Sequence, residues 1–151
     1  MKTEIEQILD WFKAAVPNPT DENLCVQIGC HYEEIGEMAN VLLDDDAKHA
    51  VRWYSDDYMG VNEGARTYLA GLGDDEKTEL LDALCDQIVT AIGVGYMAGF
   101  DMAGALQEVI RSNASKFENG KPLFDENGKI RKGKDYTQPE LARFVNKRGE
   151  E

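Results

Sequence analysis

The clearest helical signal in the chain lies in residues 20–43, which read TDENLCVQIGCHYEEIGEMANVLL. Thr20 is a favourable helix N-cap, and the acids that follow it suit the positive end of a helix dipole. Beyond them, apolar side chains recur at the spacing of one helix face; they are Leu24, Ile28, Ile35, Met38, Val41 and Leu42. Because three aspartates come next, the segment predicts one long amphipathic helix that ends near residue 43.

The same spacing predicts further helices over residues 3–16, 75–98 and 102–116. In the second of these we expect five apolar side chains to be buried, those of Leu80, Leu84, Ile88, Val89 and Ile92. Residues 47–71 mix aromatic side chains with glycines, which predicts short helices or an irregular insertion.

The C-terminal segment differs in character from the rest. Asn-Gly pairs at 119–120 and 127–128 are turn signals, so residues 118–151 predict a small hairpin or an extended arm. The length suits one compact domain spanning residues 1–151. We therefore expect an all-α fold, a bundle of four or five helices, with an extended basic C-terminal arm.

The net charge of −13 is unevenly distributed. Residues 1–115 carry 7 basic and 22 acidic side chains, whereas residues 116–151 carry 9 basic and 7 acidic ones. An acidic body repels a phosphate backbone, which argues against binding to a nucleic acid polymer. It is compatible with carboxylates that hold a metal while nearby cations meet a small anionic ligand. Composition alone favours a plain solvated acidic surface.

The N-terminus and the cysteines favour a cytoplasmic protein. Residues 1–6 carry acids where a signal peptide has a basic region and an apolar core. The longest uncharged run, between Asp86 and Asp101, is too short to span a bilayer, so we expect no membrane association. The cysteines have no CxxC spacing, and we expect buried, reduced thiols and no zinc site. They are Cys25, Cys30 and Cys85.

Two clusters of carboxylates stand at helical spacing. The motif EExxE that begins at Glu33 places Glu34 and Glu37 one turn apart on one helix face. The motif ExxD places Glu79 and Asp82 together in the same way. Neither pair has a lysine or arginine three or four residues away that would form the usual surface ion pair.

If the two helices pack antiparallel, the four carboxylates converge and need a counter-charge. Mg²⁺ suits them, because it prefers carboxylate oxygens and takes substrate phosphates as further ligands. It would polarise a phosphorus centre and lower the pKa of a bound water, which predicts metal-assisted hydrolysis of a nucleotide. Two other interpretations stay open: a solvated acidic face, and a di-iron bundle, which lacks its Glu-x-x-His motifs here.

The ordered series of motifs resembles the MazG-like all-α nucleoside triphosphate pyrophosphohydrolases. That superfamily includes the dimeric dUTPases, the dCTP pyrophosphatases and phosphoribosyl-ATP pyrophosphohydrolase. The series is EExxE at 33–37, ExxDALxD at 79–86, VIRSNASKF at 109–117, GKPLF at 120–124 and GKxxKGxxYxxPxL at 128–141. The resemblance covers residues 24–44 and 75–141, which is most of the chain.

The resemblance implies that Glu34, Glu37, Glu79 and Asp82 hold Mg²⁺, with Mn²⁺ as a substitute. Glu33 and Glu34 would be catalytic, Glu33 by positioning the attacking water. Water would attack the α-phosphorus of a nucleoside triphosphate, preferably a dNTP, and release a monophosphate and diphosphate. Because the helices are too few to cover a deep site, we expect a homodimer or a homotetramer. The resemblance to phage and bacterial members implies the cytoplasm of a bacterium or of a phage-infected host.

Four further residues complete the predicted substrate site. Asn113 and Lys116 stand at the end of a predicted helix, where the family's Asn and Lys face the phosphates. Gln27 and His31 lie on the same side of their helix as Glu34, and each is a candidate for a contact with base or sugar.

The sequence departs from the family pattern in the length of one segment. The 41 residues between Glu37 and Glu79 exceed the usual gap, so residues 47–71 are a candidate insertion that alters substrate access or oligomer contacts.

The competing hypothesis is an acidic helical interaction protein without catalysis, a nucleic-acid mimic or a regulator. Such a protein spreads its acids over the surface, whereas the enzyme gathers four of them.

Overall fold

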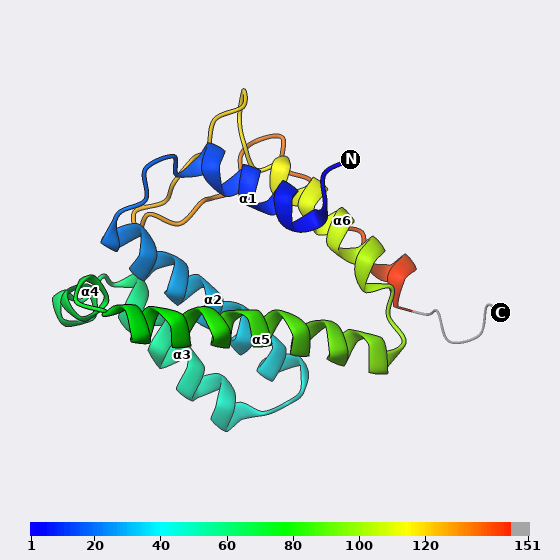
Figure 1. Ribbon diagram of the computed structural model, residues 1–151. Helices are drawn as coiled ribbons and strands as arrows, with labels where there is room; N and C mark the ends of the chain where they lie inside the picture. The colour runs from blue at the N-terminus through cyan, green and yellow to red at the C-terminus, as the bar shows by residue number, and fades with distance from the viewer. Residues whose placement is uncertain (146–151) are drawn as a thin grey trace. The chain divides into compact units, whose positions relative to one another are not determined.

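The computed structural model describes residues 1–145, and it confirms that the chain is all-α (Figure 1). In these residues the only pairing of extended backbone is at isolated bridges in the C-terminal segment. The helices are α1 (Glu4–Ala15), α2 (Asp21–Val41), α3 (Asp45–Met59), α4 (Glu63–Ala70), α5 (Asp74–Ala98), α6 (Met102–Ala114) and the short 3-10 helix η1 (Ala142–Phe144). The described part thus has six α-helices, because the expected insertion forms two.

The chain folds into two compact units, which are described one at a time. The first unit contains residues 1–15, 73–123 and the chain from 132 onward, and so holds α1, α5, α6 and η1. The second unit contains residues 16–72 and 124–131, and so holds α2, α3 and α4. The C-terminal segment therefore contributes to both units. Whether they act as one domain stays a prediction.

Helix α2 begins where the sequence predicts. The Thr20 hydroxyl accepts a hydrogen bond from the Asn23 backbone N–H at 3.2 Å, and the Asn23 side chain accepts one from the Thr20 backbone N–H at 2.9 Å. This reciprocal capping box satisfies two of the backbone donors that a helix start leaves unpaired. The helix ends at Val41, two residues before the predicted end, because Leu43 has turned to a φ of 58°.

The second unit is organised around the close approach of α2 and α3. Ser55 is buried, and its hydroxyl donates to the Gly29 carbonyl oxygen at 2.8 Å. A Cβ on Gly29 would lie 2.5 Å from Met59 Cγ and 2.9 Å from the Ser55 carbonyl oxygen. Only glycine lets the two helices come this close, so Gly29 fixes the register of the pair.

An aromatic stack and a hairpin complete this unit. The Tyr32 ring stacks on Tyr54 and Tyr58, with centroids 5.6 and 5.9 Å away. In the hairpin, Phe124 pairs with Ile130 across the turn. The Asp125 carboxylate accepts from the backbone N–H groups of residues 127 and 129 at 2.9 and 3.0 Å. This local bonding explains why the predicted Asn-Gly turn closes there.

In the first unit, α1 packs on α6 through Trp11. Its indole Nε1 donates to the Asn113 carbonyl oxygen at 2.9 Å. Its ring stacks on Phe117 with centroids 5.4 Å apart. The Lys116 ammonium lies over the same ring, 5.9 Å from its centroid. One indole therefore ties α1 to the end of α6 and orders the residues around that end.

The C-terminal arm is extended, as predicted, and it is bound to α6 by a buried carboxylate. Glu108 is 7% exposed and accepts hydrogen bonds from Arg111 Nη2 at 2.7 Å and from the Glu140 backbone N–H at 2.9 Å. It also forms an ion pair with Arg143, whose Nη2 lies 3.6 Å away. The hydrogen bond from Arg111 is the main reason that the pKa of Glu108 is lowered to about 2. Ser112 adds a bond to the Thr137 carbonyl oxygen at 2.8 Å. The carboxylate thus connects helix and arm.

The prediction that the apolar side chains of α5 are buried is wrong. The five apolar side chains that we expected to be buried are between 36% and 65% exposed, and Gly95 is the buried residue of this helix. In the described part of the first unit, α5 meets α6 at their corner, where a Cβ on Gly95 would lie 2.0 Å from Met102 Sδ. Cys85 on α5 is likewise exposed, although Cys25 is buried as predicted. Among the described residues of the first unit, no other helix runs alongside this row, since α6 meets α5 only at the corner.

By length and composition, α5 is the one helix in the described residues that could cross a membrane. An apolar stretch of 18 residues within it still includes Asp82 and Asp86. A charged side chain at the centre of a bilayer costs about 3 kcal/mol or more. The helix is therefore weak evidence for a membrane span.

Candidate functional site

The five predicted carboxylates lie on two helices, as the spacing indicated. Glu33, Glu34 and Glu37 are on α2 in the second unit, whereas Glu79 and Asp82 are on α5 in the first. In the described residues, no group of three or more His, Cys, Asp or Glu side chains is placed to hold a metal ion. A site that combines both helices therefore stays a prediction, and each helix is considered in its own unit.

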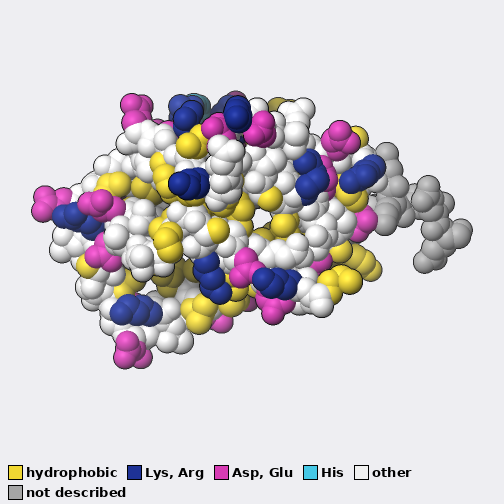
Figure 2. Space-filling view, turned by 90° about the horizontal axis from the view of Figure 1, so that it is seen from above, with side chains coloured by type: hydrophobic (Ala, Val, Ile, Leu, Met, Phe, Trp, Pro, Cys, Tyr) yellow, Lys and Arg dark blue, Asp and Glu magenta, His cyan; other side chains and the backbone are white. Residues whose placement is uncertain are grey.

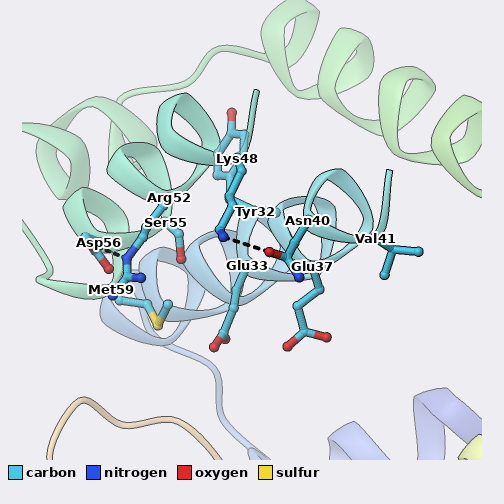
Figure 3. Close-up of a pocket in the computed structure, with 11 residues that line it drawn as sticks. Tyr32, Glu33, Glu37, Asn40, Val41, Lys48, Arg52, Ser55, Asp56 and Met59 are labelled. Carbon is cyan, nitrogen blue, oxygen red and sulfur yellow. Dashed lines mark hydrogen bonds and ion pairs between the residues drawn. The ribbon is translucent and has the colours of Figure 1, made fainter. Parts of the chain in front are cut away.

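A groove of about 570 Å³ lies between α2 and α3, entirely within the second unit (Figure 3). This volume is in the range of small-molecule sites. Its charged members include Glu33, Glu37, Lys48 and Arg52. The full lining is Tyr32, Glu33, Gly36, Glu37, Asn40, Val41, Lys48, Arg52, Ser55, Asp56 and Met59. The motif EExxE thus contributes its first and last glutamates to a concave surface.

The two glutamates of the groove are four residues apart, which places them on one face of α2. Figure 3 shows their side chains extending from α2 to the same side. Two carboxylates are the protein ligands that Mg²⁺ commonly takes when phosphates supply the remaining oxygens. The donor set of the groove therefore suits an ion that arrives with a polyphosphate; Glu37 would hold it, with the Glu33 carboxylate beside it.

Glu33 is also bound by the C-terminal hairpin. The Lys129 ammonium donates to the Glu33 carboxylate, and both side chains are a little over one-third exposed. Burial alone would lower the pKa of Lys129, but the hydrogen bond and the charge of Glu33 outweigh it and raise that pKa. Lys129 therefore remains a cation, and the pair fixes the position of the Glu33 carboxylate.

The cations of the groove come from α3. Lys48 Nζ donates to the Asn40 side-chain oxygen at 2.7 Å. Arg52 Nε lies 3.8 Å from an Asp56 carboxylate oxygen, and both of these side chains are at least 70% exposed. An exposed pair of this kind contributes at most about 1 kcal/mol, so Arg52 can exchange Asp56 for a ligand.

The other predicted residues of α2 do not line this groove. Gln27, His31 and Glu34 are exposed on the helix, outside the lining residues. The helix periodicity explains the exclusion of Glu34, because neighbouring residues such as Glu33 and Glu34 point about 100° apart on a helix, and the groove lies on the side of Glu33. Their predicted roles toward metal, base or sugar are untested.

The predicted phosphate contacts on α6 take part in packing. The Asn113 carbonyl oxygen binds the Trp11 indole, and the Lys116 ammonium lies over that ring. The Lys116 carbonyl oxygen also accepts from the Gly133 backbone N–H at 3.1 Å. These contacts hold both residues at the end of α6, and their role toward phosphates stays a prediction.

Sequence reasoning did not assign Lys48 and Arg52 to the site, and it did not assign Lys129 to Glu33. A signal for the first pair was present, because residues four apart on a helix share a face. It was hidden because residues 47–71 gave no clear periodicity. The contact of Lys129 with α2 joins residues 96 apart in sequence, and nothing local indicates it.

Comparison of the chain with models of known protein families, with curated protein sequences and with solved structures gives no match.

Proposed function

We propose that the protein is a Mg²⁺-dependent nucleoside triphosphate pyrophosphohydrolase, which converts a nucleoside triphosphate and water into a monophosphate and diphosphate. The observation that carries the proposal is the α2–α3 groove, which presents Glu33 and Glu37 together with Lys48 and Arg52. Carboxylates and cations in one groove are what the complex of a divalent cation with a polyphosphate requires. The proposal includes Mn²⁺ as a substitute for Mg²⁺ and a dNTP as the preferred substrate.

The chain's own residues have distinct tasks in this proposal. Lys129 holds the Glu33 carboxylate at the groove, where it can accept a hydrogen bond from a water molecule and orient it. Lys48 and Arg52 meet phosphate oxygens through charge-assisted hydrogen bonds. When bound, Mg²⁺ supplies charge neutralisation at the phosphates and a lower pKa of coordinated water. The resemblance implies further metal ligands in Glu34, Glu79 and Asp82, and their part in holding an ion stays a prediction.

The test is a screen of the eight common NTPs and dNTPs with separation of the products. We expect a monophosphate and diphosphate in equal amounts, in the presence of Mg²⁺ and not in EDTA. A nucleoside diphosphate with inorganic phosphate would show attack at the γ-phosphorus and contradict the proposed chemistry. If none of the eight nucleotides is hydrolysed, the proposed enzymatic activity is wrong.

We also propose that the chain associates with a second copy of itself through the apolar row on α5. A continuous exposed row of this kind is typical of an interaction surface. Its members are Leu80, Leu81, Leu84, Ile88, Val89 and Ile92. The row shares its helix with Glu79 and Asp82, so that a self-associated helix would hold these carboxylates rigidly. The proposed assembly is a homodimer or homotetramer in the cytoplasm, without membrane or nucleic acid.

The exposed row also favours a second candidate function, an acidic interaction protein that uses α5 to bind a partner and has no catalysis. The face in Figure 2 shows Lys and Arg among Asp and Glu, which does not suit a uniformly acidic mimic. Thermal melts separate the two candidates. The enzyme should melt higher with millimolar Mg²⁺ and higher still with a non-hydrolysable nucleotide. The interaction protein should respond to neither.

A further inference from the structure

We propose that the α2–α3 groove is the subsite for the polyphosphate of the substrate, and that Lys48 and Arg52 bind its oxygens. The inference rests on the proposed function and gives a role to residues 47–71, which the family resemblance leaves out. Lys48 and Arg52 are four residues apart on α3, so they share a helix face, and both line the groove.

The glutamates of the α2 wall and the cations of the α3 wall, all in the described part of the chain, do not form ion pairs with each other across the groove, so a ligand can meet both. In the described residues, no ion pair joins Glu33 or Glu37 on α2 to Lys48 or Arg52 on α3. Glu33 is bound by the hairpin lysine. Lys48 donates to the Asn40 amide oxygen on α2, and Arg52 pairs with the Asp56 carboxylate on its own helix. A purely structural groove of mixed charge would be expected to close through direct pairs.

This arrangement selects the chemical class of the ligand. A bare polyphosphate is attracted by the α3 cations but repelled by the α2 carboxylates. A bare divalent cation is attracted by the carboxylates but repelled by the α3 cations. The complex of a polyphosphate with a divalent cation carries both signs of charge and suits both walls. Its phosphate oxygens would face Lys48 and Arg52, and the cation would face Glu33 and Glu37.

The remaining lining suits the organic part of a nucleotide. The Tyr32 ring is held by its stack on two tyrosines of α3, and Met59 adds an apolar surface at the same groove. The volume of about 570 Å³ exceeds the lower limit for small-molecule sites of about 300 Å³. The groove thus has room for a nucleoside beside the polyphosphate.

Calorimetric titration with inorganic tripolyphosphate tests the subsite without relying on turnover. We expect wild type to bind tripolyphosphate with Mg²⁺, and Lys48→Glu and Arg52→Glu each to weaken that binding at least tenfold. Arg52→Lys should weaken binding less than Arg52→Glu does, because it retains the charge but loses the planar guanidinium that can bond two phosphate oxygens. Lys13→Glu on α1, in the other unit, has the same change of charge and should bind like wild type.

A second measurement compares the affinity for tripolyphosphate with and without Mg²⁺ in a variant of the α2 wall. In EDTA, Glu37→Gln should bind tripolyphosphate more tightly than wild type, because it removes a repelling charge. With Mg²⁺ the same variant should bind it less tightly. Opposite signs support the subsite, whereas an unchanged affinity in both buffers overturns it. This variant retains the size of the side chain, so it tests the groove even if a charge reversal on α3 disturbs the fold.

The outcomes separate the subsite from the proposed function. If the protein hydrolyses nucleotides and the two charge reversals leave KM and tripolyphosphate binding unchanged, the subsite is wrong and the function stands. If tripolyphosphate binding depends on Lys48 and Arg52 but none of the eight nucleotides is hydrolysed, the subsite stands and the function is wrong. Failure of wild type to bind tripolyphosphate, with and without Mg²⁺, overturns the subsite.

Discussion

Helices α2 and α5 have the same kind of sequence pattern but very different surroundings. Both are long and carry apolar side chains at helical spacing. Helix α2 has α3 beside it, with Gly29 against Met59 and a buried hydrogen bond to Ser55. Part of its own predicted apolar row is nevertheless at least 40% exposed, namely Leu24, Met38, Val41 and Leu42. Helix α5 has its apolar row exposed and meets α6 only at a corner in the described residues. The pattern therefore predicts which face of a helix is apolar, and says nothing of what covers that face.

The difference has a physical origin in the chain's connections. Three residues join α2 to α3, so the two helices return on each other, and Gly29 allows the backbones to approach. Helix α5 is instead followed by Gly99 at a φ of 83°, a left-handed C-cap that sends α6 away from it. In the described residues of its own unit, α5 has no helix alongside it, and the proposed second copy would cover its apolar row.

The largest effect should come from a charge in the α5 row. We expect Ile88→Glu to raise the dissociation constant of the homo-oligomer at least about 100-fold, because association would bury an unpaired carboxylate. Sedimentation at several concentrations measures it. Thr90→Glu is the matched control, since it adds the same charge on the side of α5 that faces away from Ile88. A wild-type chain that is monomeric at every concentration would contradict self-association.

The next effect tests the close approach of α2 and α3. Gly29→Leu should lower the free energy of unfolding by about 3 kcal/mol, because its side chain must enter the space of Met59 and of the α3 backbone. Urea denaturation measures the change. The variant should also lose tripolyphosphate binding, since the groove depends on the register of these helices. Unchanged stability would show that the two helices can separate without loss.

A third prediction concerns the arm that α6 holds in the first unit. The pKa of Glu108 is about 2 in the folded protein, below its usual value near 4.5, chiefly because Arg111 donates hydrogen bonds to it. A lowered pKa stabilises the fold above about pH 4.5, and that stabilisation is lost as the pH falls toward 2. Glu108→Gln should therefore melt several degrees lower at pH 7, with a smaller further decrease between pH 5 and pH 2.5.

The control for this titration is Glu140→Gln. Its backbone N–H donates to Glu108, but its own carboxyl group is exposed in the arm. It should keep the wild-type dependence of melting temperature on pH. If both variants have the same dependence as wild type, the lowered pKa of Glu108 is not what fastens the arm.

The parts of the fold that depend on neighbouring residues can be predicted from the sequence, whereas the features that depend on distant contacts cannot. The Thr20 cap, the end of the first helix near residue 16 and the turn at Gly128 were predictable because each depends on neighbours in sequence. For residues 47–71 the sequence left short helices and an irregular insertion open, because aromatics and glycines obscured the period, and the structure has the helices α3 and α4 there. The exposure of α5 was not predictable, because burial depends on a partner.

The candidate site shows the same limit. Spacing placed Glu33 and Glu37 on a helix, and the structure puts both in a groove. The other wall of that groove, with Lys48 and Arg52, comes from the segment that the sequence described least well. Whether Glu79 and Asp82 join this site depends on packing between units, which no spacing rule predicts.

The smallest effect compares two glycines of the same helix. Gly36 also lines the groove, but a Cβ there would meet nothing within 4 Å, in contrast to Gly29. Alanine is favoured over glycine inside a helix by up to about 1 kcal/mol, because glycine loses more backbone entropy on folding. Gly36→Ala should therefore raise the free energy of unfolding by nearly that amount, measured by urea denaturation. It should leave tripolyphosphate binding unchanged, since a methyl group takes little of the groove. Destabilisation by Gly36→Ala would mean that this part of α2 is packed and not open, and that the contrast between the two glycines is wrong.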